Sequence, residues 1–71
     1  YGLAGAVWSN DLKQAHRIAR DMQTGVIWVN TYYNLPRGMP VGGYKQSGFG
    51  RELSWDILRD YTITKSVIIP L

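Results

Sequence analysis

Two short apolar runs frame the N-terminal part of the chain. Residues 4–8 are apolar and are followed by the turn-forming residues Ser9, Asn10 and Asp11, so they predict a strand. Residues 26–29 are apolar with no polar alternation, which is typical of a strand covered on both faces in a parallel sheet. A helix-forming segment separates the two runs, and the order strand, helix, strand predicts a βαβ unit and an α/β fold.

The segment between the two runs has the spacing of an amphipathic helix. Apolar residues recur every three or four positions, which predicts a helix over residues 11–23. We expect Ser9 or Asn10 to cap its N-terminus, with Asp11 beside the positive end of the helix dipole. We expect Gly25 to end the helix in a left-handed conformation.

The rest of the chain is expected to form a long loop, a second helix and a terminal strand. Residues 30–50 are rich in Gly, Pro, Tyr and Asn, and loops of this length in compact domains are usually functional or packed against something. Residues 52–61 place apolar side chains on one helical face, which predicts a helix. Residues 62–69 are dense in β-branched side chains and are followed by Pro70, which predicts a strand.

This last strand has no obvious antiparallel partner in the chain. An unprotected hydrophobic edge normally pairs with another segment or another chain, so we expect assembly through added β-pairing. One alternative is that residues 62–69 pair with residues 26–29 in the same domain. Another is a stand-alone interaction module that docks a partner through this strand and through the tyrosine-containing loop at residues 30–50.

Composition limits what a chain of 71 residues does alone. The length allows one small core, and the absence of cysteine excludes disulfides and thiolate metal sites. The net charge of +3 comes from basic residues that alternate with acidic ones, which is typical of solvated surfaces and not of a nucleic-acid-binding face. No apolar run spans a membrane and no signal peptide is visible, so we expect a cytoplasmic protein without membrane association. The chain begins at Tyr1, so we expect a processed chain or a fragment.

The long loop contains a glycine-rich sequence, GGYKQSGFGRE, at residues 42–52. Such loops can hold phosphate, but the dinucleotide-binding pattern lacks its third glycine here and the P-loop pattern lacks Gly-Lys-Ser/Thr. The alternatives are a nucleotide-binding module and a tight turn whose glycines let backbones approach closely, and the failed patterns favour the turn. The same long loop carries bulky side chains that form a pocket wall or an interface, or else fill the core: Tyr32, Tyr33, Leu35 and Val41.

Four motifs resemble the aldehyde dehydrogenase family. YGLAGAVW at residues 1–8 resembles the family's YGLAAGV segment, and GVIWVN at residues 25–30 resembles its GTVWVN strand. MPVGGYKQSGFGRE at residues 39–52 is similar to PFGGYKQSGxGRE, and YT followed by Lys65 resembles the closing YTxxK. The resemblance covers the whole chain in one register, and its wording is closest to the betaine aldehyde dehydrogenase group.

The resemblance implies an enzyme that oxidises an aldehyde to a carboxylic acid with NAD or NADP. In the family a cysteine attacks the aldehyde, hydride passes to the cofactor, and a glutamate activates the water that releases the acid. This chain has no cysteine, so alone it is expected to be inactive and to need the remainder of the parent enzyme. The resemblance assigns residues 1–61 to the C-terminal part of the catalytic domain and residues 62–71 to an oligomerisation strand. The parent is then a homo-oligomer, either a dimer or a tetramer.

The resemblance also implies substrate-binding residues. The loop after the WVN strand lines the substrate tunnel in the family, which points to Thr31, Tyr33, Leu35 and Val41. Many members carry an aromatic residue where Val41 stands, so a wider or less aromatic pocket is expected here.

A cation site and one departure from the family complete the resemblance. In betaine aldehyde dehydrogenase-like members, backbone carbonyls of the GGYKQSG segment bind a potassium ion, which points to Lys45 and Gly48 together with an acidic ligand from outside this chain. Many members also pair the arginine of GRE with an acidic residue directly after YT. Ile63 stands there in this chain, so we expect Arg51 to bond to main-chain carbonyls or to another subunit instead.

Overall fold

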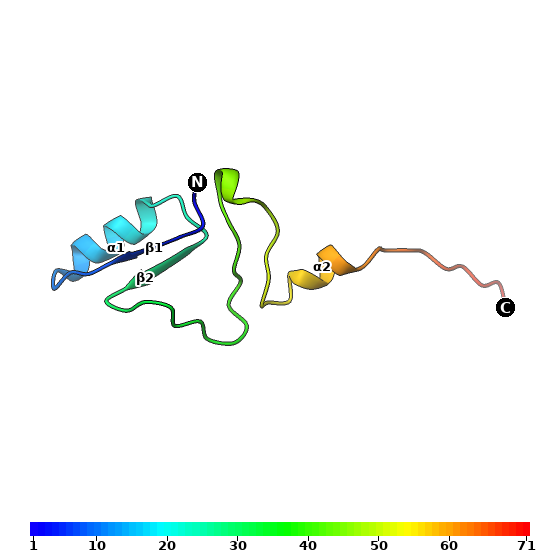
Figure 1. Ribbon diagram of the computed structural model, residues 1–71. Helices are drawn as coiled ribbons and strands as arrows, with labels where there is room; N and C mark the ends of the chain where they lie inside the picture. Colours follow the sequence, from blue (N-terminus) through cyan, green and yellow to red (C-terminus); the bar gives the residue numbers. More distant parts are fainter.

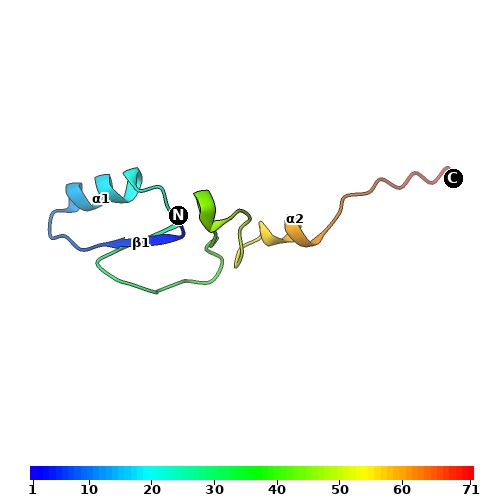
Figure 2. The ribbon, with the colours of Figure 1, turned by 45° about the horizontal axis from the view of Figure 1, so that its top comes forward.

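The computed structural model describes all 71 residues as a βαβ unit, a long loop and a tail (Figure 1). Strand β1 (Ala4–Val7) pairs in parallel with β2 (Val26–Val29) along four residue pairs. Helix α1 (Leu12–Asp21) connects the strands and packs against both of them (Figure 2). The predicted βαβ unit and the bounds of β2 are confirmed, and β1 ends one residue earlier than expected.

The N-terminus of α1 is capped differently from the prediction. Asp11 is the N-cap, because its carboxylate accepts a hydrogen bond from the Gln14 N–H at 3.2 Å. Ser9 has another role, since its hydroxyl accepts a hydrogen bond from the Asp11 N–H at 3.0 Å. The prediction of Ser9 or Asn10 as the cap was therefore wrong.

The C-terminus of α1 also differs from the prediction. The helix ends at Asp21, and Met22 follows in an extended conformation while its N–H donates to the Ile18 carbonyl at 2.9 Å. Gly25 does not have a positive φ, so the predicted left-handed cap was wrong. Glycine is needed there for a different reason, because a Cβ would overlap the carbonyl oxygen of Gly42 in the distant loop.

The two faces of the sheet are covered by different parts of the chain. On one face, the Met22 side chain from the end of α1 fills the space beside Gly5 and Ile27. Side chains alternate along a strand, so Trp28 lies on the opposite face, where its ring meets that of Tyr32. The cover predicted from the unbroken apolar sequence of β2 is only partial, because Trp28 is buried, Val26 and Ile27 are half-buried and Val29 is exposed.

The second helix is much shorter than predicted. The helix expected over residues 52–61 is reduced to α2 (Ile57–Tyr61). Leu53 has a φ of 62°, in the left-handed region that interrupts a right-handed helix. Glu52 pairs with Val41 in an antiparallel bridge, which removes it from any helix.

Residues 62–71 form no helix and no strand, and they extend away from the rest of the molecule (Figures 1 and 2). The radius of gyration is 17.4 Å, whereas a compact chain of this length would have about 11 Å. The strand predicted over residues 62–69 is absent because a strand requires a ladder partner. Since β2 pairs with β1 alone, the alternative in which the tail pairs with residues 26–29 is wrong.

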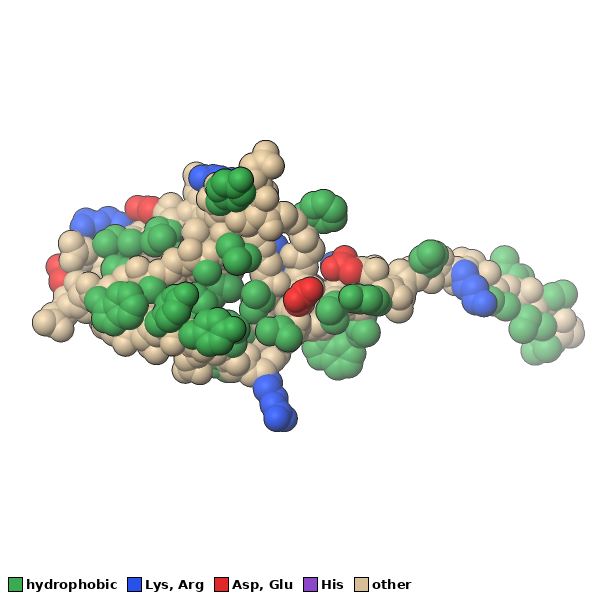
Figure 3. Space-filling model, viewed as in Figure 1, with side chains coloured by type: hydrophobic (Ala, Val, Ile, Leu, Met, Phe, Trp, Pro, Cys, Tyr) green, Lys and Arg blue, Asp and Glu red, His purple; other side chains and the backbone are tan.

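Apolar side chains lie on the surface of the tail as well as on the body of the molecule (Figure 3). In the tail, Ile63 and Ile68 are almost fully exposed. None of the helices is both long enough and apolar enough to cross a lipid bilayer.

Candidate functional site

The glycine-rich loop is closed at its base and tied down at its tip. At the base, Val41 and Glu52 exchange two backbone hydrogen bonds, of 3.0 and 2.7 Å. At the tip, the Tyr44 N–H donates to the Gly2 carbonyl at 2.7 Å, and the Gly2 N–H donates to the Ser47 hydroxyl at 2.9 Å. Hydrogen bonds therefore fix the loop at both places, and its tip is attached to Gly2, just before β1.

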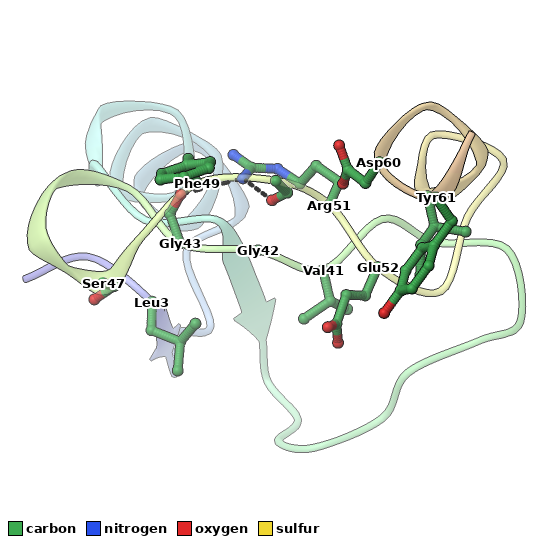
Figure 4. A pocket seen from close by; sticks show the side chains of 12 residues that line it. Leu3, Val41, Gly42, Gly43, Ser47, Phe49, Arg51, Glu52, Asp60 and Tyr61 are labelled. Carbon is green, nitrogen blue, oxygen red and sulfur yellow. Dashed lines mark hydrogen bonds between the residues drawn. The ribbon is translucent and has the colours of Figure 1, made fainter. Parts of the chain in front are cut away.

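Arg51 bridges two parts of this loop (Figure 4). Its Nη1 donates to the Gly50 carbonyl at 2.8 Å and to the Gly43 carbonyl at 3.1 Å. Its guanidinium carbon lies 5.7 Å from the centre of the Tyr44 ring, within range of a cation–π interaction. The expectation that Arg51 bonds to main-chain carbonyls in place of an acidic partner is confirmed.

A pocket of about 460 Å³ lies between the glycine-rich loop and α2 (Figure 4). Its walls combine the guanidinium of Arg51 and the carboxylates of Glu52 and Asp60 with apolar side chains. Val41 is the only one of the four predicted substrate residues that lines this pocket.

The other three predicted substrate residues lie on the loop that follows β2. Thr31 and Tyr33 are exposed, and Leu35 is half-buried. The Tyr33 ring centre lies 6.5 Å from that of Trp28, so this part of the loop packs beside the sheet. Within this chain, the four predicted residues therefore do not share one cavity.

The two predicted cation ligands lie close together. Lys45 begins the short 3-10 helix η1 (Lys45–Ser47), and Gly48 follows it. The Gly48 N–H donates to the Lys45 carbonyl at 3.2 Å, and the Gly48 carbonyl accepts no hydrogen bond from the chain. No group of three or more His, Asp or Glu side chains of this chain is placed to hold a metal ion.

The ion pair of this chain lies outside the glycine-rich loop. Arg20 and Asp21 form an exposed ion pair at 2.9 Å at the end of α1. The hydrogen bond from the Arg20 guanidinium holds the pKa of the Asp21 carboxyl below its usual range. This pair lies on the helix and not in the pocket, so it has no part in the site.

Two contributors to the site were not found in the sequence. Ser47 fixes the loop tip to Gly2 across 45 positions, a contact for which the local pattern gives no signal. The Trp28 indole N–H donates to the Asn34 carbonyl at 2.8 Å and so reaches the loop that follows β2. A buried tryptophan requires a hydrogen-bond partner, and that requirement is the one signal that could have indicated this contact.

A model of the aldehyde dehydrogenase family matches residues 1–67. The chain belongs to the aldehyde dehydrogenase family. It is 51% identical over all 71 residues to the betaine aldehyde dehydrogenases of Vibrio vulnificus strains YJ016 and CMCP6. It spans only 15% of the length of these relatives.

Solved structures from this aldehyde dehydrogenase family share the fold of the chain. The betaine aldehyde dehydrogenase of Staphylococcus aureus in complex with NAD+ is similar with a TM-score of 0.84 and 46% identity, over 92% of this chain and 13% of that one. An apo mutant of the same enzyme gives a TM-score of 0.84 and 46% identity over the same shares of the two chains. The small α/β unit therefore has the geometry of the corresponding piece of these larger enzymes.

Proposed function

We propose that this chain is the C-terminal part of an enzyme that oxidises betaine aldehyde to a carboxylic acid with NAD. The family match over residues 1–67 carries the proposal. The names of the Vibrio relatives support the substrate, and the NAD+ complex of the Staphylococcus enzyme supports NAD over NADP. No observation supports the alternative of a stand-alone interaction module.

The full-length enzyme that contains this chain provides the test. We expect NADH to form when the enzyme is mixed with betaine aldehyde and NAD, and to form more slowly with a neutral aldehyde of similar size. Absence of turnover with every aldehyde would contradict the proposal. The isolated chain is the control, and it should be inactive because it has no cysteine.

Within this enzyme, Thr31, Tyr33, Leu35 and Val41 would contribute to the wall of the substrate tunnel. The exposure of Thr31 and Tyr33 supports this role, as does the position of Val41 beside the pocket. Replacing Val41 by Phe should raise the KM for bulky aldehydes more than the KM for small ones. An equal change for both would contradict a role in substrate selection.

The carbonyls of Lys45 and Gly48 would contribute to a potassium site. The free carbonyl of Gly48 and its proximity to Lys45 support the idea, because carbonyl oxygens replace the hydration shell of potassium well. An acidic ligand from another part of the enzyme would complete the site. Activity that is identical in potassium and in lithium buffers would contradict it.

Residues 62–71 would form the oligomerisation strand, and residues 1–61 would belong to the catalytic domain. The exposed apolar side chains of the tail and its lack of a ladder partner support this division. The parent enzyme would then be a homo-oligomer in which the tail joins a sheet outside this chain.

A further inference from the structure

Trp28 links the rigid sheet to the loop that follows it. Its side chain is 8% exposed, and it is the only large side chain of the chain that is buried. The indole N–H donates to the Asn34 carbonyl at 2.8 Å, six residues further along. The Tyr32 ring meets the indole edge-on at 5.0 Å between centroids, and the Tyr33 ring lies at 6.5 Å.

The loop depends on this contact because it has little else to hold it. Residues 31–35 make no other hydrogen bond with the protein. The backbone bends through the left-handed region at Asn30, with a φ of 55°, and at Tyr33, with a φ of 59°. Non-glycine residues rarely adopt this conformation and need surrounding contacts to hold them there.

We infer that Trp28 is a positioning residue for substrate binding: its indole N–H holds the 31–35 loop in the shape that presents Tyr33 and Leu35 to the aldehyde. The inference rests on the proposed role of these two residues in the substrate tunnel. In this role Trp28 acts on the loop and not on the substrate. It acts through the Asn34 carbonyl and through packing against the two tyrosine rings.

A purely structural role for Trp28 makes a different prediction. If the indole only fills space, its shape matters and its N–H does not, because the ring contributes the buried apolar area. If the indole positions the loop, loss of the N–H alone releases the Asn34 carbonyl and lets the loop move. The two roles are therefore separated by a change that keeps the bicyclic shape and removes only the donor.

Benzothienylalanine at position 28 of the full-length enzyme makes this change, since sulfur replaces the indole N–H. We expect the KM for betaine aldehyde to rise by about threefold to tenfold, the range for loss of one hydrogen bond. The KM for NAD and the melting temperature should stay close to those of the wild type. The same replacement at Trp8, which is 64% exposed and whose indole N–H makes no hydrogen bond, is the matched control and should leave both KM values unchanged.

A double-mutant cycle shows whether Trp28 acts through Tyr33. Tyr33→Ala and the benzothienylalanine replacement should together raise the KM by less than the product of their separate effects. An active wild type whose aldehyde KM is unchanged by the replacement would overturn the inference and leave the proposed function intact. A wild type with no aldehyde turnover would reject the proposed function, and the inference with it.

Discussion

Strand β2 (Val26–Val29) and the tail segment at residues 67–69 are both short runs of large apolar side chains, yet only one of them is a strand. β2 pairs with β1, and its two faces contact Met22 at the end of α1 and Tyr32 in the following loop. In the tail, Val67 is 66% exposed and Ile68 is 90% exposed, and neither has a ladder partner. Similar sequences therefore have different structures because one has a partner within the chain. A segment with high strand propensity forms a strand only where a neighbouring strand can pair with it and other side chains can cover it.

The largest effect should come from blocking the tail in the full-length enzyme. Val67→Pro removes a backbone N–H, so the tail could no longer complete a ladder at that position. We expect loss of the proposed homo-oligomer, measured by light scattering. Val67→Thr keeps the N–H and the β-branch and should preserve assembly. An intact oligomer in the proline variant would mean that the tail is not an assembly strand.

The next effect tests the join between the βαβ unit and the loop. Gly25→Ala should lower the free energy of unfolding by about 3 kcal/mol, because the new Cβ would overlap the Gly42 carbonyl, which belongs to a backbone that cannot rotate away. Gly38→Ala is the control: it has open space around it but a φ of +86°, so it should cost only about 1 kcal/mol. Denaturant unfolding of the full-length enzyme measures both. Equal costs would show that the close approach at Gly25 is unimportant.

A smaller effect is expected at Arg51. Arg51→Ala removes both bonds to carbonyls and should destabilise the enzyme by about 2 kcal/mol, with faster hydrogen exchange in residues 42–50. Arg51→Lys keeps the charge but not the planar group, so it should recover only part of the loss. Exchange in residues 4–7 of β1 is the internal control. Unchanged exchange in the loop would contradict the bridging role of Arg51.

The smallest effect concerns the exposed pair on α1. Because Arg20 lowers the pKa of Asp21 in the folded state, the pair stabilises the protein above the unfolded pKa, and this contribution is lost as the pH falls through the folded pKa. Asp21→Asn should therefore lower the melting temperature slightly at neutral pH and not at all in acid. A difference that grows in acid would contradict this sign.

The sequence predicted the elements that are decided locally or by an adjacent segment. β2 was predicted with its observed bounds, since an unbroken apolar run next to a helix has few alternatives. The helix over residues 52–61 was not, because the left-handed turn at Leu53 and the bridge from Glu52 to Val41 depend on a distant segment. The role of Gly25 was not predicted either, because glycine is required there by the close approach of the Gly42 carbonyl, which lies in a distant segment.

The site shows the same division between local and distant information. The resemblance, with Ile63 in place of an acidic residue, left main-chain carbonyls and another subunit as alternatives for Arg51, and the structure shows the bonds to carbonyls. The separation of Val41 from Thr31, Tyr33 and Leu35 could not be predicted, because it depends on the path of the loop through space. The substrate and cation roles of these residues remain predictions.

The burial of Trp28 also gives this segment an optical property. Its other two tryptophans, Trp8 and Trp55, are 64% and 85% exposed, whereas Trp28 is 8% exposed. Iodide in solution should quench the emission of the two exposed indoles more than that of Trp28, whose ring lies beside those of Tyr32 and Tyr33. If every other tryptophan of the enzyme were replaced by phenylalanine, a movement of the 31–35 loop would shift the emission wavelength of Trp28. No added dye would be needed.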